Sequence, residues 1–292
     1  MTDSRRYVAT IGFFDGVHNG HRYLIRQVCD EALSRGLASL VVTFPEHPRS
    51  VLVPSSRVSL LSLPDEKRER LLSAGVDRVA MMSFTHELGR LSPFEFMDML
   101  RDDYGVEVLV VGYDHHFGHG SQYGFEDYRA YGEHHGIDVV KALELSDMRC
   151  SSTAVREALE RGDVDSASRM LGYNYTLTGR VVRGFHLGTG LGFPTANVEA
   201  DGRKLVPANG VYAVLADGHP AMLNIGVRPT MDNGSAVSVE AHIFDFSGDL
   251  YGKSMTLTFL KRLRDEIRFP DTQSLRGQLM DDERYCRRFF GR

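Results

Sequence analysis

The chain has 292 residues, of which 42% are hydrophobic and 25% are charged, a composition typical of a globular protein with one large or two ordinary domains. Its formal net charge of -5 gives no basic surface of the kind that binds nucleic acid, so we expect no nucleic-acid partner. No apolar run approaches the roughly 20 residues of a membrane span and no signal peptide is recognisable, so we expect a cytoplasmic protein without a membrane partner.

The first 172 residues alternate short strand-like segments with helical patterns. The predicted strands are Tyr7–Ile11, Leu37–Phe44, Arg78–Met82, Val106–Val111 and Gly136–Lys141. Strands that alternate with helices predict right-handed βαβ units and a Rossmann-like parallel sheet covered on both faces. Ligands bind at the carboxyl edge of such a sheet. His18, His47 and Asp114 each follow a predicted strand and can therefore converge at that edge.

The stretch GFFDGVHNGH, residues 12–21, places His18 and His21 at the junction of the first predicted strand with a helix. Glycines at 16 and 20 let the backbone approach a ligand closely, and a helix N-terminus attracts an anion. Two imidazoles at this point can donate hydrogen bonds to phosphate oxygens and stabilise the charge that develops at a phosphorus under attack. Taken alone, the H-x-G-H pattern is equally compatible with two surface histidines that cap a helix.

Two further stretches of the first part carry polar side chains of interest. In RCSSTAVREAL, Ser152 lies at a predicted helix start and Arg156 in its first turn, which suits either a triphosphate clamp or a well-capped surface helix. In DHHFGHG, three histidines lie close together, but no fourth ligand is evident, so we interpret this run as a loop at a pocket rim. The cysteines are three and widely spaced, which predicts neither a disulfide framework nor a zinc site.

From residue 173 the pattern changes to short alternating segments broken by Gly, Pro and Asn, which predicts an antiparallel barrel or sandwich. The net charge changes from negative to slightly positive at the same point, so we expect two domains, residues 1–172 and 173–292. A closing helix is predicted over Asp271–Phe290, with Leu275, Leu279, Tyr285 and Phe289 on one face. The predicted strands are Thr176–Arg183, Gly210–Leu215, Ala221–Ile225, Ser238–Phe244 and Ser254–Leu263.

The stretch GFHLGTGLGFPTANV is the most informative part of the second domain. Its glycines at 184, 188, 190 and 192 predict a flexible loop that can wrap a polyphosphate with backbone N–H groups. Thr195 and Asn197, two residues apart at the start of a strand, point the same way and offer two neutral oxygens. Such oxygens suit Mg²⁺ bound together with nucleotide phosphates.

Six segments of the first domain, in order, resemble the FAD synthetase module of the prokaryotic bifunctional riboflavin kinase/FAD synthetases, over nearly all of residues 7–165. They are IGFFDGVHNGH, VVTFPEHPRSVL, DEKRERLLSAGVDRVAMMSF, LSPFEFMDML, VLVVGYDHHFGHGSQYG and SSTAVREAL. H-x-G-H is also similar to the signature of the nucleotidyltransferase superfamily. The resemblance implies that His18 and His21 stabilise phosphate charge, that Arg156 binds the triphosphate and that His47 lies near FMN. The residues that it places around ATP are Gly12, Phe13, Asp15, His18, His21, Asp114, Ser152 and Arg156. Many members of the family carry Asn where this chain has Asp114.

The second domain resembles the riboflavin kinase module over about residues 176–290, on GFPTANV, VPANGVYAV, NIGVRPTM and SVEAHIFDFSGDLYG. The resemblance implies that Thr195 and Asn197 hold Mg²⁺ and ATP phosphates, that Gly188 and Gly192 contact ATP, and that Glu240 is the catalytic base. Without the resemblance, Glu240 would read as an outward strand residue paired with a surface Arg. Thr189 replaces an Arg of the family pattern, and a bidentate phosphate donor is lost with it. Arg183 or Lys204 could compensate.

The expected protein is a two-domain cytoplasmic enzyme that makes both flavin cofactors with Mg²⁺ and ATP. Its substrates would be riboflavin, FMN and ATP, and its products FMN and FAD. Two alternatives stay open, an enzyme that retains one of the two activities and a flavin-binding protein without turnover. An adenylyltransferase for a different acceptor would leave the P-T-A-N stretch unexplained. The sequence leaves a homo-oligomer open.

Overall fold

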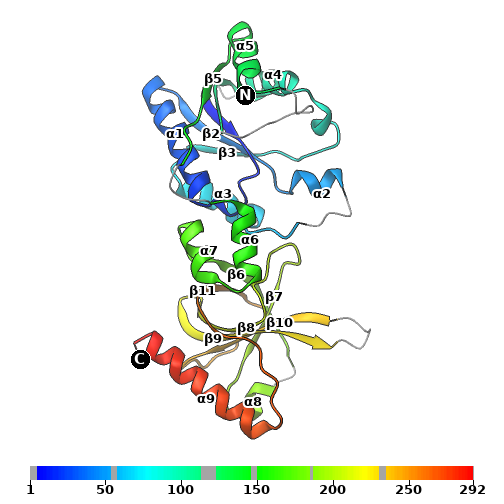
Figure 1. Ribbon diagram of the computed structural model, residues 1–292, viewed down its shortest axis with the longest axis vertical. Coiled ribbons are helices and arrows are strands. Elements are labelled where there is room, and N and C mark those ends of the chain that lie inside the picture. The colour runs from blue at the N-terminus through cyan, green and yellow to red at the C-terminus, as the bar shows by residue number, and fades with distance from the viewer. Residues whose placement is uncertain are drawn as a thin grey trace. The chain divides into compact units, whose positions relative to one another are not determined.

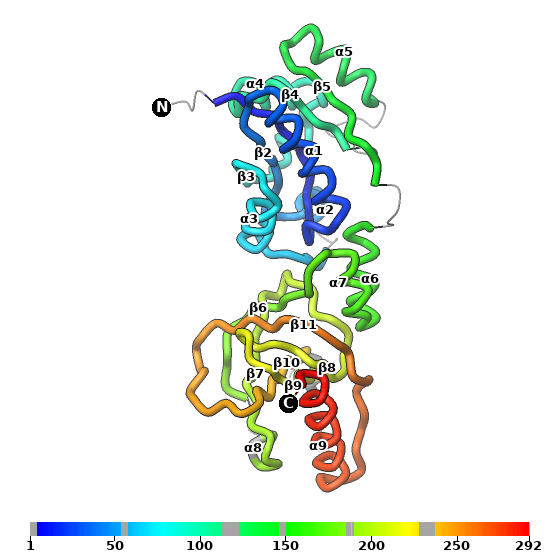
Figure 2. The backbone as a smooth tube through the Cα atoms, turned by 90° about the vertical axis from the view of Figure 1, so that its left-hand side faces the viewer, coloured from blue at the N-terminus to red at the C-terminus, as the bar shows by residue number. Residues whose placement is uncertain are grey.

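The computed structural model describes residues 5–53, 58–112, 123–145, 150–184, 187–229 and 235–291. These residues form two compact units, Met1–Ser152 and Thr153–Arg292. The division lies before the boundary after residue 172 that the sequence suggests, and that boundary remains a prediction. The elements of each unit can be followed along the chain in Figures 1 and 2.

The first unit is built on a five-stranded parallel sheet in the order β3-β2-β1-β4-β5. All five predicted strands are confirmed, and their ends differ from the prediction by at most two residues. The fully buried β1 lies at the centre, where β2 pairs with it from Tyr7↔Ala38 to Ile11↔Val42. The strands are β1 (Tyr7–Ile11), β2 (Ala38–Thr43), β3 (Arg78–Met81), β4 (Val106–Val111) and β5 (Asp138–Lys141).

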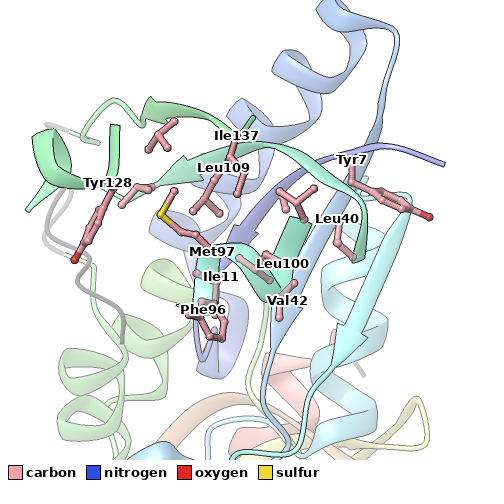
Figure 3. Packing of buried hydrophobic residues seen from close by; sticks show 14 of the residues in the cluster. Tyr7, Ile11, Leu40, Val42, Phe96, Met97, Leu100, Leu109, Tyr128 and Ile137 are labelled. Carbon is pink, nitrogen blue, oxygen red and sulfur yellow. The ribbon is translucent and has the colours of Figure 1, made fainter. Parts of the chain in front are cut away.

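Helices cover both faces of this sheet, because successive strand residues point to opposite sides. Tyr7, Ala9 and Ile11 of β1 pack with residues of α4 and α5 in the cluster of Figure 3. Val8 of β1 packs on the other face, against residues of α1. The helices are α1 (Asn19–Arg35), α2 (Pro48–Leu52), α3 (Pro64–Ser73), α4 (Pro93–Tyr104) and α5 (Phe125–His135), with 3-10 turns at Asp15–Val17 and Leu88–Arg90.

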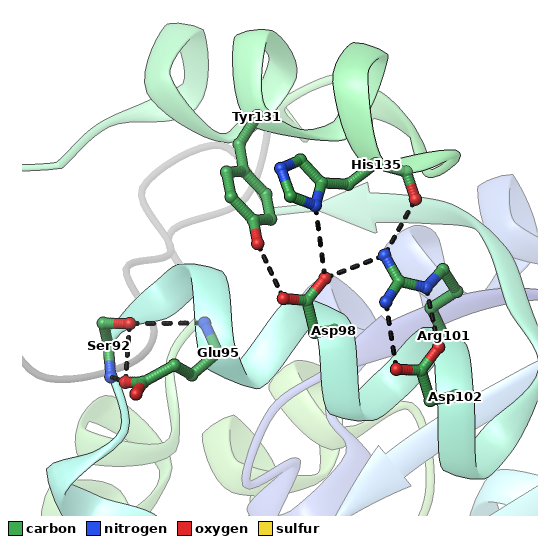
Figure 4. Close-up of polar contacts among 7 residues, drawn as sticks. All are labelled: Ser92, Glu95, Asp98, Arg101, Asp102, Tyr131 and His135. Carbon is green, nitrogen blue, oxygen red and sulfur yellow. Dashed lines mark hydrogen bonds and ion pairs between the residues drawn. The ribbon is translucent and has the colours of Figure 1, made fainter.

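Polar contacts join α4 to α5 beside this cluster (Figure 4). The carboxylate of Asp98 on α4 accepts a hydrogen bond of 2.7 Å from the Tyr131 hydroxyl on α5 and lies 2.8 Å from the Arg101 guanidinium. Arg101 also donates to the carbonyl of His135. Burial, together with the nearby Asp98, raises the pKa of Tyr131 to about 12, because both disfavour the phenolate.

The second unit is a closed antiparallel barrel in the order β10-β7-β6-β11-β8-β9, as the alternating pattern predicts. The sequence analysis recognised β7 only through Thr195 and Asn197 at its start. The strands are β6 (Thr176–Val182), β7 (Ala196–Ala200), β8 (Gly210–Ala216), β9 (His219–Pro229), β10 (Ser235–Ile243) and β11 (Ser254–Arg264); the helices are α6 (Ser152–Glu160), α7 (Val164–Leu171), α8 (Leu187–Leu191) and α9 (Thr272–Phe289).

The C-terminal helix α9 is where predicted, but the face assigned to it is partly wrong. Tyr285 and Phe289 are each 45% exposed, whereas Asp282 and Cys286 are buried. The reason is a polar anchor: the Arg264 guanidinium on β11 donates to both carboxylate oxygens of Asp282, at 2.7 and 3.1 Å. Apolar spacing alone cannot indicate a helix face that docks through an ion pair.

The structure bears on the expectations for the cysteines and for membrane-spanning segments. Cys29, Cys150 and Cys286 are all free thiols. Within the described ranges, no helix combines the length and the apolar character that crossing a membrane requires.

Candidate active sites

The turn that follows β1 has an unusual backbone. Phe14, Gly16 and Val17 take positive φ angles of 51°, 75° and 41°. Left-handed conformations at two non-glycine residues cost about 1 kcal/mol or more each, so surrounding contacts must hold the turn. The turn delivers His18 to the N-cap of α1, which begins at Asn19.

His18 and His21 lie together at the start of α1, at the carboxyl edge of the sheet. His18 is 5% exposed, and its Nδ1 accepts a hydrogen bond of 3.3 Å from the backbone N–H of His21. Because Nδ1 accepts, the neutral ring carries its proton on Nε2, the atom from which it can donate. The His21 ring stacks on it with centroids 3.6 Å apart. Two imidazoles and the positive end of a 17-residue helix thus share one location.

Asp15 fixes the turn from inside. Its carboxylate is 1% exposed and accepts hydrogen bonds of 3.0 Å from the backbone N–H groups of Leu61 and Ser62. The Ser62 hydroxyl in turn accepts from the N–H of Gly16 at 2.9 Å. These contacts give Asp15 a structural role, and the ATP contact that the resemblance implies for it remains a prediction.

Phe13 and His47 meet at the same edge. The ring of His47 lies 4.7 Å from that of Phe13, edge to face, and its Nδ1 accepts from the N–H of Arg49 at the start of α2. Beneath them lies Lys67, a residue that the sequence analysis missed, because nothing in a helical pattern marks one polar residue as buried. Its Nζ donates to the carbonyls of Phe13, at 3.0 Å, and of Phe44.

Of the remaining residues expected near ATP, Ser152 donates from Oγ to the carbonyl of Asp15 at 2.9 Å, which ties the start of α6 to the turn. Gly12 donates to the carbonyl of Val42, and a Cβ there would press against the Phe14 ring. Arg156 belongs to the second compact unit, so its role at the histidines remains a prediction. Asp114 and the histidines at 115, 116 and 119 lie outside the described residues.

The second site lies where β7 and β10 pair. Glu240 is directly opposite Asn197 in this ladder, so the two side chains share a face. Thr195 donates from Oγ1 to the Glu240 carboxylate at 3.3 Å. Asn197 is 8% exposed, and a Cβ at Gly184 would overlap its amide. Three of the residues that sequence reasoning selected in this domain, Thr195, Asn197 and Glu240, therefore converge.

The oxygens of this cluster suit a hard cation. Thr195, Asn197 and Glu240 offer a hydroxyl, an amide and a carboxylate, which are the ligand types that Mg²⁺ accepts beside water and phosphate. Over the part of the chain that the structure covers, His, Cys, Asp and Glu form no group of three with a metal-binding arrangement.

His242 is a second residue that the sequence analysis missed. It lies two positions after Glu240 on β10, and its Nδ1 is 2.8 Å from the carbonyl of Pro194. A carbonyl can only accept, so Nδ1 carries the proton and donates. The ring lies edge to face with Phe193 and Phe244. His242 therefore fixes the peptide next to Thr195, a contact that only the folded barrel reveals.

A cavity of about 480 Å³ adjoins Thr195. Phe246 and Tyr251 line it, and the Arg183 guanidinium lies over the Tyr251 ring at 6.0 Å. Lys204, by contrast, is 4% exposed and lies over the ring of Tyr175. Of the two residues considered as substitutes for the missing Arg, Arg183 is thus the one beside the cavity.

Part of the glycine-rich segment before the P-T-A-N stretch, expected to be a loop from its composition, is helical. Leu187–Leu191 forms the short helix α8, where the Gly188 carbonyl accepts from the N–H of Phe193 at 2.8 Å. Gly192 follows with a φ of 87°, a conformation that favours glycine. Since a Cβ at Gly188 would overlap the Phe193 carbonyl, this glycine permits close packing. The side chain of Thr189 lies outside the described set.

Comparison with known proteins gives matches to both units. A model of the FAD synthetase family matches residues 1–154, and a model of the riboflavin kinase family matches residues 171–290. The bifunctional riboflavin kinase/FMN adenylyltransferase of Pseudomonas fluorescens is 39% identical, covering 96% of this chain and 92% of its own. The protein of that name from Escherichia coli K12 is 36% identical, with 97% and 93% covered.

Among solved structures, the crystal structure of a protein from Streptococcus pneumoniae, titled a macrolide-efflux protein, resembles the chain with a TM-score of 0.88 and 31% sequence identity. The match covers 97% of this chain and 94% of that one.

Proposed function

The chain belongs to the family of bifunctional riboflavin kinase/FMN adenylyltransferases, and from this premise we propose that it converts riboflavin into FMN and then into FAD. The barrel unit transfers the γ-phosphoryl group of ATP to the riboflavin 5′-hydroxyl and releases ADP. The α/β unit joins the adenylyl group of a second ATP to FMN and releases pyrophosphate. The observation that carries the proposal is that each of the two matched regions contains a cluster of side chains suited to its reaction. These are His18 with His21 in the α/β unit, and Thr195 with Glu240 in the barrel.

In the barrel, Glu240 acts as the general base. Its carboxylate takes the proton of the 5′-hydroxyl while the hydroxyl oxygen attacks the γ-phosphorus. The hydrogen bond from Thr195 and the ladder position opposite Asn197 fix the orientation of this carboxylate. Thr195 and Asn197 would hold Mg²⁺, which when bound offsets the negative charge of the phosphates.

The cavity beside Thr195 receives the nucleoside part of ATP. Its volume of about 480 Å³ and its lining residues Phe246 and Tyr251 suit a planar base and a ribose. It borders Thr195 but not Glu240, as expected for the end of ATP that is remote from the reacting γ-phosphate. Arg183, beside Tyr251, supplies the cation that the Thr189 substitution removes.

In the α/β unit, a phosphate oxygen of FMN attacks the α-phosphorus of ATP, and the bond to pyrophosphate breaks. His18 donates from Nε2, and His21 beside it donates to the same phosphate, so both stabilise charge on the phosphorus in the transition state. Arg156 binds the leaving pyrophosphate, and Phe13 with His47 forms the side toward FMN. The transfer is direct and involves no covalent bond to the protein. We place the enzyme in the cytoplasm, where ATP is available.

The test is chromatography of the flavins formed from riboflavin, ATP and Mg²⁺. The unmodified chain should form FMN and then FAD. His21→Ala should stop at FMN, and Glu240→Gln should leave riboflavin unchanged but still convert added FMN into FAD. FMN alone from the unmodified chain would indicate a single retained activity, and flavin binding without ATP consumption would indicate a binding protein; either result would contradict the proposal.

A further inference from the structure

We propose that Lys67 is a positioning residue for adenylyl transfer: its ammonium group joins the loop after β1 to the loop after β2 and sets their separation. The inference rests on the proposed function of the α/β unit. The two loops carry the histidine turn and His47, which the proposal assigns to the phosphates and to the FMN side. One buried group would thus align both substrates.

The contacts of Lys67 span the site. The residue belongs to α3 and its side chain is fully buried. Nζ donates to the carbonyl of Phe13, the residue just before the strained turn, and to the carbonyl of Phe44, three positions before His47. It also lies 3.8 Å from the centroid of the Phe13 ring. The Phe13 ring also contacts the His47 ring, so the Lys67 ammonium, the Phe13 ring and the His47 imidazole form a continuous group.

A purely structural role would not favour a lysine at this point. A buried ammonium loses its hydration, and an apolar side chain of similar length would fill the space at a lower free-energy cost. Two carbonyls and an aromatic face offset part of the loss. The carbonyl of Phe13 also accepts from the hydroxyl of Thr43 at 3.0 Å, so it would keep a donor without Lys67. What the ammonium adds is a hydrogen-bonded bridge between the carbonyl of Phe13 in one loop and the carbonyl of Phe44 in the other.

The charged groups around Lys67 come from the elements packed on it. Asp15, in the turn, favours the charged ammonium. The His47 ring lies 4.7 Å, edge to face, from the same Phe13 ring that the ammonium contacts. Glu66, the neighbour of Lys67 on α3, accepts from the N–H of Leu63 and caps the helix. Burial dominates and lowers the pKa of Lys67 to about 8, against the opposing effect of Asp15. The ammonium is therefore charged at neutral pH and loses its proton in mildly alkaline solution.

Because the pKa of Lys67 is lowered, the free energy of unfolding and the rate of adenylyl transfer should change in opposite directions with pH. The pKa of Lys67 is lower in the folded chain than in the unfolded chain, so between about 8 and 10.5 the unfolded state binds the extra proton. The contribution of Lys67 to the free energy of unfolding then rises with pH in this range. Adenylyl transfer should show the opposite trend, because the charge that holds the two loops is lost.

The experiment compares Lys67→Met with Arg68→Met, the exposed neighbour on the same helix. At about pH 7, Lys67→Met should lower kcat/KM for FMN about 10-fold to 100-fold, mainly through KM, as expected when loops shift by an ångström or less. Arg68→Met should behave like the unmodified chain. Formation of FMN from riboflavin by the same samples is the control that shows whether the barrel unit is folded and active.

The ratio of unmodified to Lys67→Met activity should shrink between about pH 7 and about pH 9, since the unmodified ammonium deprotonates while methionine cannot. A ratio that is constant with pH, or an activity loss below twofold, would overturn the proposal. If Lys67→Met does not fold, the unmodified chain decides: its FAD formation should fall through pH 8 while circular dichroism stays unchanged, and a flat profile overturns the proposal. An unmodified chain that forms no FAD would overturn the proposed function together with this inference.

Discussion

Gly184 packs closely against the proposed kinase site. A side chain at this position would overlap the amide of Asn197, which lies opposite Glu240 and is almost fully buried. The amide has little room to turn away, so the cost of an added methyl group falls on the proposed ligand of Mg²⁺ and ATP rather than on the surrounding core.

Gly184→Ala should therefore lower riboflavin phosphorylation by about 10-fold or more, because small displacements of binding groups have effects of that size. Gly202→Ala is the matched control, since nothing lies within 4 Å of its added Cβ. Both variants should convert FMN into FAD at the unmodified rate. Unimpaired phosphorylation by Gly184→Ala would show that Asn197 need not hold its observed position.

Site residues could be predicted from the sequence where they belong to a short motif. They could not be predicted where their role depends on contacts with residues distant in the chain. His18, His21, Thr195 and Asn197 stand in short patterns whose spacing already suggests phosphate or metal chemistry. Lys67 reaches carbonyls that are 54 and 23 residues away in sequence. His242 contacts a carbonyl 48 residues away. Such partners are determined by the packing of strands and helices, which no local pattern encodes.

Among the elements, α9 is joined to the barrel by a buried ion pair in addition to its apolar contacts. Asp282 is 4% exposed and accepts from Arg264 through both oxygens, while Gln278 donates to it at 2.8 Å. The neighbouring pair of Asp281 and Arg284 has a similar separation of 3.0 Å, but both side chains are more than 60% exposed.

Asp282→Ala should lower the free energy of unfolding by about 3 kcal/mol or more, because Arg264 would remain in place without its counter-charge. Asp281→Ala should change it by less than about 1 kcal/mol, as is usual for solvent-exposed pairs. Urea denaturation of the two variants, followed by circular dichroism, makes the comparison. Equal midpoints for both variants would show that α9 does not depend on the buried pair.

Elements were predicted well where their residues share one periodicity. The five strands of the parallel sheet are β-branched runs that read as buried strands, and their limits are right within two residues. The apolar spacing of α9 gave its limits within one residue but placed Tyr285 and Phe289 wrongly on the packed face, since the docking also depends on Arg264 of another element. Composition also misled at Leu187–Leu191, where glycines form a helical turn against Phe193.

At the scale of the whole molecule, the two proposed sites belong to different compact units. His18 and His21 lie in the first unit, and Glu240 lies in the second. A chain damaged at one site should then be rescued by a chain damaged at the other. An equimolar mixture of His21→Ala and Glu240→Gln should convert riboflavin into FAD, since FMN released by the first variant can be used by the second.

The readout is FAD accumulation in the mixture compared with either variant alone. Each variant alone should form no FAD from riboflavin, and the mixture should form it after a lag in which free FMN accumulates. A mixture that stops at FMN, although the Glu240→Gln variant accepts added FMN, would mean that the intermediate is passed on only within one chain.

The strand order of the first unit also has a consequence for how the protein is made. β1 lies at the centre of the sheet and pairs with β4, and Ser152 donates to the carbonyl of Asp15 in the turn after β1. The turn that carries the proposed catalytic histidines therefore gains its full support only after residue 152 has been synthesised. The last strand of that sheet ends at Lys141, before the first barrel strand begins at Thr176. Because domains fold as units during synthesis, starting from the N-terminus, the ribosome builds the enzyme in the reverse order of its reactions. The unit that consumes FMN is complete before the unit that produces it exists.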